Sequence, residues 1–68
     1  MNGTQYLDGQ RVIGMYLDEI PVAGVVELSR VKFGGGMSHH IKLDKSVTVY
    51  GSVRERVILD ENEIKAIL

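Results

Sequence analysis

The chain of 68 residues has no cysteine, no tryptophan, a single proline and almost no net charge. Without cysteine no disulfide can form, which excludes a disulfide-stapled secreted fold. Without tryptophan, and with only 6% aromatic residues, an aromatic groove for proline-rich peptides is not expected. A formal net charge of -1 argues against a dedicated nucleic-acid-binding domain, because such domains usually carry a clear positive excess.

Long apolar runs are also missing. The longest runs, such as the one from Val22 to Val26, are far shorter than the roughly 20 residues that a transmembrane helix needs. The opening MNGTQYLDGQ has neither the basic start nor the apolar core of a secretory signal. We therefore expect a cytoplasmic protein with no membrane partner. Because domains below about 70–80 residues commonly need metal, disulfides or self-association for stability, we also expect a homo-oligomer.

The charge that is present is distributed unevenly. Residues 1–29 carry a formal charge of -3, residues 30–45 carry +3, and the remainder carries -1. The cations of the central stretch are Arg30, Lys32, Lys42 and Lys45. Adjacent histidines in the same stretch add charge under mild acidity. This basic stretch is the main candidate surface; the alternative is a solvated flank that only keeps the domain soluble.

Short runs rich in β-branched and aromatic residues, separated by turn signals, predict a mainly β domain. We expect strands at residues 11–17, 22–33, 38–43, 47–50 and 53–59. The turns between them are predicted from Gly34 to Gly36, at residues 44–46 and at Gly51-Ser52.

One predicted strand changes its alternation part-way. The apolar residues from Val22 to Leu28 keep one alternation, but Val31 and Phe33 fall one position out of step. A slip of one residue turns core side chains toward solvent unless the strand accommodates an extra residue. We therefore predict a β-bulge or sharp bend near residues 29–30.

The end of the chain carries a helix signal. Asp60 and Glu63 have the spacing of a capping box. We expect a short helical turn that ends the chain, with Ile64, Ile67 and Leu68 on the face that packs across the sheet.

Five short strands, tight turns and a terminal helical turn resemble the Src-homology-3-like small barrels. The pattern VILDENEI at residues 57–64 looks like the last strand and short helix of many such modules. The resemblance implies a small five-stranded barrel at residues 11–68, preceded by an N-terminal extension of residues 1–10. It implies no particular function, since barrels of this kind serve unrelated functions.

The glycine triplet has two interpretations. Gly34, Gly35 and Gly36 permit positive φ and predict a flexible hairpin loop. Their successive N–H groups offer a phosphate-binding alternative, in which nearby basic side chains such as Arg30 and Lys32 supply positive charge. The common phosphate loops have more widely spaced glycines followed by a helix, whereas here a strand is expected to follow.

The histidine pair does not predict a metal site or an enzyme. Because neighbouring residues of a strand point to opposite faces, His39 and His40 cannot bind one ion from a single subunit. A site shared across an oligomer axis is the alternative; otherwise one histidine lines the edge of the core and the other faces water. Ser38 beside His39 offers a nucleophile and a base, but no third group is placed to orient them. We predict no catalytic residue, no metal and no cofactor.

In its small size and its lack of an enzyme signature, the chain resembles the small accessory proteins of bacteriophages and plasmids. We therefore expect a non-catalytic binding protein that captures or inhibits a host protein through its basic, glycine-rich hairpin. The predicted binding residues are Arg30, Lys32, Phe33, Gly34, Gly35, Gly36, His39, His40 and Lys42. Two alternatives remain: an oligomeric binder of a phosphate-bearing small molecule such as a nucleotide, and a nucleic-acid-binding module in which an aromatic ring stacks on a base.

Overall fold

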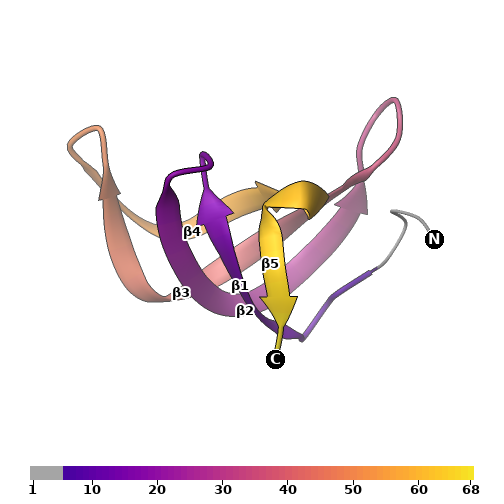
Figure 1. Ribbon diagram of the computed structural model, residues 1–68, viewed down its shortest axis with the longest axis horizontal. Helices are drawn as coiled ribbons and strands as arrows, with labels where there is room; N and C mark the ends of the chain where they lie inside the picture. Colours follow the sequence, from indigo (N-terminus) through magenta and orange to yellow (C-terminus); the bar gives the residue numbers. More distant parts are fainter. Residues whose placement is uncertain (1–5) are drawn as a thin grey trace.

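The computed structural model describes residues 6–68, which form one antiparallel sheet of five strands and one short 3₁₀ helix. The elements are β1 (Arg11–Tyr16), β2 (Ile20–Val31), β3 (Met37–Val49), β4 (Ser52–Asp60), the 3₁₀ helix η1 (Glu61–Glu63) and β5 (Ile64–Ile67). Their order across the sheet is β4-β3-β2-β1-β5, so the last strand pairs with the first (Figure 1). The predicted mainly β architecture is confirmed, although the chain is divided into strands differently.

The sheet curls, so that β1 approaches the end of β4 without pairing with it. Gly14 on β1 lies so close to the end of β4 that a Cβ there would be 2.8 Å from Leu59 Cδ1 and would overlap the carbonyl oxygen of Glu63. Within residues 6–68, however, β4 pairs only with β3, and β5 pairs only with β1. The sheet is therefore open at this junction.

The prediction of a turn at residues 44–46 is wrong. These residues lie inside β3, which runs from Met37 to Val49, so two predicted strands are halves of one. The ladder between β3 and β4 shifts register between Lys42 and Val47. Extra residues at this shift let β3 bend instead of reversing. The exposed side chains of residues 44–46 are compatible with a bent strand, so their turn-like composition does not force a turn.

The C-terminal segment begins as predicted and then departs from the prediction. The capping box is present at the start of η1, where the backbone N–H of Asp60 donates to Glu63 Oε1 at 2.8 Å. The helix ends after one turn and β5 follows, so the predicted helical face of Ile64, Ile67 and Leu68 is wrong. Ile64 packs against the core, whereas Ile67 is 46% exposed. Pairing with β1 gives backbone partners to a segment that is too short to be a stable helix.

The irregularity predicted in β2 exists but lies earlier in the strand. The register with β3 shifts between Val26 and Leu28, not at residues 29–30. Beyond the shift Ser29, at 4% exposure, faces inward, and Leu28, at 45% exposure, faces outward. The apolar pattern misplaces the bulge because a hydrogen-bonded serine occupies a core position.

The core fills the inner face of the curled sheet. Its buried members are Leu7, Val12, Val22, Val26, Ile41, Leu43, Val57 and Leu59. Leu7 belongs to this core although the sequence places it in an N-terminal extension; residues 1–5 of that extension lie outside the described residues. The N–H of Gly9 donates to the Val26 carbonyl at 2.8 Å, and the N–H of Val26 donates to the Gln10 carbonyl at 2.9 Å. The residues just before β1 are thus joined to β2.

Candidate functional site

The β2–β3 hairpin ends in a glycine-rich loop that projects from the sheet (Figure 1), and this loop carries one fully exposed phenylalanine. The N–H of Lys32 donates to the Gly36 carbonyl at 2.9 Å, and the N–H of Gly35 donates to the Lys32 carbonyl at 3.0 Å. All three glycines of the loop have positive φ, between 82° and 110°, which other residues adopt only with strain. Phe33 is 108% exposed. The predicted hairpin loop is confirmed, with the phenylalanine ring in solvent at its tip.

Side chains alternate between the two faces of β3. His39 and Ile41 are buried on the inner face, whereas Ser38, His40 and Lys42 lie on the outer face. The prediction that the adjacent histidines occupy opposite faces is confirmed.

An apolar pair lies on either side of His40 on the outer face. The register places Leu28 of β2 and Ile58 of β4 opposite His40, and these two residues are 45% and 51% exposed. Arg30 lies on the same face, two residues after Leu28 on β2, and Lys42 lies two residues after His40 on β3. Because the strands are antiparallel, the two cations lie on opposite sides of the Leu28–His40 pair. We call these five residues the outer patch: Leu28, Arg30, His40, Lys42 and Ile58.

Two cations of the outer patch are uncompensated. Lys32 Nζ is 3.4 Å from Asp60 Oδ1, which offsets the charge of the lysine. Within residues 6–68, neither Arg30 nor Lys42 makes a salt bridge. An anionic group of a partner would therefore meet Arg30 and Lys42 without displacing an acidic side chain of the domain.

A carboxylate of the chain already lies beside the glycine loop. The N–H of Met37 donates to Glu61 Oε1 at 3.1 Å. A Cβ on Gly36 would lie 3.6 Å from Glu61 Oε2, and the N–H of Gly35 is used within the loop. The Glu61 carboxylate thus lies beside the loop, and its charge would repel a phosphate there. This arrangement disfavours the phosphate-binding alternative.

His39 lies in the interior, away from the surface to which the sequence assigns it. It is 2% exposed, and its Nδ1 lies 2.7 Å from Ser29 Oγ. Ser29 Oγ also accepts the N–H of Leu7 at 2.9 Å, so its own hydroxyl proton can be donated to Nδ1 of a neutral imidazole. Burial lowers the pKa of His39, and the negative charges of Glu61 and Asp8 oppose this shift. His39 is therefore a structural residue rather than a surface contact.

The buried imidazole makes stability depend on pH. In the unfolded chain His39 titrates near 6.5, and in the folded chain its pKa is lower, so the unfolded state binds more protons between these values. The free energy of unfolding is expected to be highest above pH 6.5. It should fall as the pH drops through 6.5, by up to about 1.4 kcal/mol per pH unit. Urea denaturation at several pH values between 7.5 and 5.5 measures the decline. It should vanish in His39→Gln and persist in His40→Gln; a decline that persists in both variants contradicts this role.

The sequence does not point to the two apolar members of the outer patch. Leu28 fits the core pattern because the bulge precedes it, and its exposure becomes visible only from the register. Ile58 could have been found, because the alternation of the core residues Val57 and Leu59 places it on the other face. Among the predicted residues, Arg30, His40 and Lys42 come together on the outer patch, and Lys32 lies with Phe33 and the glycines in the loop.

The potential metal ligands and the helices of the described residues, and a comparison with known proteins, do not indicate a function. Residues 6–68 contain no group of three or more His, Cys, Asp or Glu that could hold a metal ion. No helix in this part of the chain is long and apolar enough to cross a membrane. The chain shows no significant match to protein-family models, to curated proteins or to solved structures. Its function must therefore be argued from the hairpin and the surfaces beside it.

Proposed function

We propose that the chain is a non-catalytic protein-binding domain that captures its partner with the β2–β3 hairpin. The observation that carries this proposal is the full exposure of Phe33, at 108%, at the tip of the loop. Burying such a side chain in a partner stabilises a complex by about 1.5–3 kcal/mol. Aromatic side chains and arginine are also enriched among the residues that dominate binding energies at protein interfaces. The loop glycines let the tip adapt to the partner.

The outer patch indicates the chemistry of the partner. Arg30 and Lys42 have no salt-bridge partner in the described part of the chain, while Leu28 and Ile58 are about half exposed. A protein with an apolar pocket for Phe33 and acidic groups around that pocket complements this surface. Complementary charge would speed association and fix orientation. The partner class that we propose is a host protein, captured or inhibited by a small accessory protein.

A nucleic-acid partner is the second candidate, because an exposed phenylalanine beside free cations also suits stacking on a base. The charge of the chain favours a protein instead. The formal net charge is -1, and Asp60 offsets the charge of Lys32.

We also propose that the curled sheet is a Src-homology-3-like barrel. Support comes from five antiparallel strands, the close approach of β1 and the end of β4 at Gly14, and the single helical turn near the C-terminus. Self-association in the cytoplasm, expected for so short a chain, is part of the same proposal.

Replacing Phe33 with alanine tests the proposed function. The partner is first isolated from the natural host by affinity capture and identified, and its dissociation constant is then measured with purified components. Phe33→Ala is expected to weaken binding about 30-fold or more, as for an interface residue that contributes about 2 kcal/mol. The matched control is Tyr50→Ala, because Tyr50 is 90% exposed at the tip of the β3–β4 hairpin and should not matter.

Salt dependence separates the two partner classes. A protein interface is expected to lose little affinity between 50 and 200 mM salt, whereas a nucleic-acid complex with 6–10 phosphate contacts loses about 10³–10⁵-fold. Unchanged affinity in Phe33→Ala, or an equal loss in both variants, would contradict the role of the loop tip. A steep salt dependence would favour the nucleic-acid alternative.

A further inference from the structure

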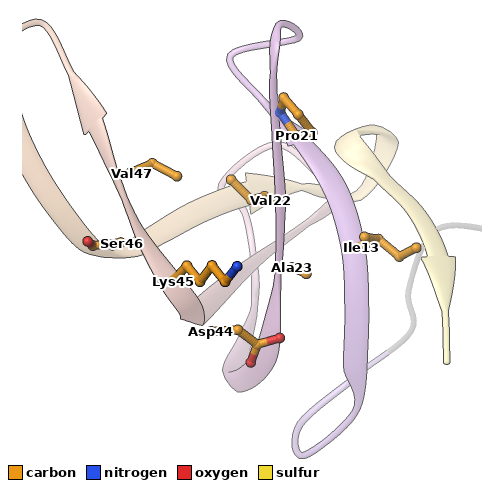
Figure 2. Close-up of a pocket in the computed structure, with 8 residues that line it drawn as sticks. All are labelled: Ile13, Pro21, Val22, Ala23, Asp44, Lys45, Ser46 and Val47. Atoms are coloured by element: carbon orange, nitrogen blue, oxygen red, sulfur yellow. The ribbon is translucent and has the colours of Figure 1, made fainter.

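A second surface feature lies away from the hairpin tip, where β2 and β3 diverge. Their ladder ends at the pair Gly24 and Leu43. From there β2 continues back to Ile20 paired only with β1, and residues 44–46 of β3 are paired with neither neighbour. The divergence opens a groove of about 490 Å³ between the two strands, shown in Figure 2. This volume lies in the range of pockets that bind small ligands or short peptide segments.

One side of the groove combines apolar side chains with an edge of backbone. Ile13 of β1, Val22 of β2 and Val47 of β3 give it apolar walls. Pro21 has no backbone N–H, and proline within sheets is confined to edges, bulges and strand starts. Ala23 has a register partner on β1 and none on β3. This stretch of β2 therefore behaves as a strand edge inside the sheet.

Besides Asp44, the charged residue that lines the groove is Lys45. Its side chain extends from β3 toward β2 in Figure 2. Lys45 makes no salt bridge within residues 6–68, whereas the neighbouring Asp44 pairs with Arg11. An apolar wall, a strand edge and one uncompensated ammonium group thus lie together.

We propose that this groove binds an extended peptide segment that carries an acidic side chain. The peptide adds as a short strand along residues 21–23 of β2, which supplies affinity through main-chain hydrogen bonds. Because successive side chains of an extended peptide point to opposite sides, one of its apolar residues packs against Val22 and Val47, which face each other across the groove in Figure 2, while a neighbouring carboxylate pairs with Lys45. The groove is separate from the hairpin tip, so the proposal does not depend on the role of Phe33.

Peptide titration followed by NMR tests this site. The probe is the acetylated, amidated hexapeptide TVDVTV, and its matched control is TVKVTV, which differs in one charge. Added to the ¹⁵N-labelled full chain, the acidic peptide is expected to cause saturable amide shifts confined to residues 22–23 and 44–47. The lysine peptide is expected to bind at least tenfold more weakly.

A charge reversal on the protein completes the test. Lys45→Glu is expected to invert the preference between the two peptides, while Lys65→Glu, the same change on β5, leaves it as in the parent chain. Lys45→Gln, which only removes the charge, should equalise the two affinities. Thermal midpoints of the variants confirm that each is folded. The proposal is overturned by the absence of saturable shifts up to several millimolar peptide, by equal affinity of both peptides for the parent chain, or by shifts centred on the loop at Phe33.

Discussion

Gly24→Ala is expected to destabilise the domain by about 3 kcal/mol or more, because a Cβ at this position meets backbone rather than open space. It would overlap the carbonyl oxygen of Lys42 and lie 2.9 Å from Ile41 Cγ2. Gly24 pairs directly with Leu43, so the strand cannot move away without breaking the ladder. Small domains have total stabilities of only about 5–15 kcal/mol, so the loss should be evident as a large fall in the urea midpoint followed by circular dichroism.

Gly9→Ala separates steric overlap from backbone strain. Gly9 has φ of 84° but nothing within 4 Å of an added Cβ, so only the cost of a left-handed conformation applies, about 1–2 kcal/mol. Equal destabilisation by the two substitutions would contradict the close approach of β2 and β3 at Gly24.

Ser29→Ala is expected to cost about 2–3 kcal/mol of unfolding free energy. The hydroxyl accepts the N–H of Leu7 at 2.9 Å and lies 2.7 Å from His39 Nδ1. Removing it leaves two polar groups in the interior without these partners, and each unsatisfied buried group costs about 1–3 kcal/mol. Urea denaturation at pH 7.5, where His39 is neutral, measures the loss.

Ser38→Ala is the control for this loss. Ser38 lies on the outer face of β3, next to His39 in sequence, and substitutions at such surface positions usually change stability by less than about 0.5 kcal/mol. If both serine substitutions have the same small effect, the network of Leu7, Ser29 and His39 does not contribute to stability.

The features of the fold that depend on local chemistry were predictable from the sequence. The glycine triplet predicts the β2–β3 hairpin loop, because only glycine adopts positive φ freely. The spacing of Asp60 and Glu63 predicts the capping box, since both partners lie within one turn. Alternation along β3 separates His39 from His40.

The features that depend on pairing between distant segments were not predictable. Residues 64–67 form a strand because β1 offers them a backbone partner, and nothing within the segment itself encodes that edge. The turn expected at residues 44–46 is a bend, since β3 stays paired with β4 on both sides of it. Ser29 reads as a surface residue because the groups that satisfy its hydroxyl, on Leu7 and His39, come from other parts of the chain.

The candidate site shows the same division. The cations and the loop with Phe33 follow from the sequence, and the alternation of Val57 and Leu59 places Ile58 on the outer face, whereas the exposure of Leu28 becomes visible only once the bulge fixes the register. The groove beside Lys45 arises where β2 and β3 diverge, a feature of the sheet rather than of any one segment.

Site-specific photo-crosslinking tests most directly the central claim that the loop tip captures a protein. Benzoylphenylalanine replaces Phe33 in the full chain, which is produced in its natural host cells and irradiated there. We expect a discrete protein adduct that nuclease treatment does not change, and no such adduct when the same residue replaces Tyr50. No adduct at position 33, an adduct that nuclease removes, or the same set of adducts from both positions would contradict the claim.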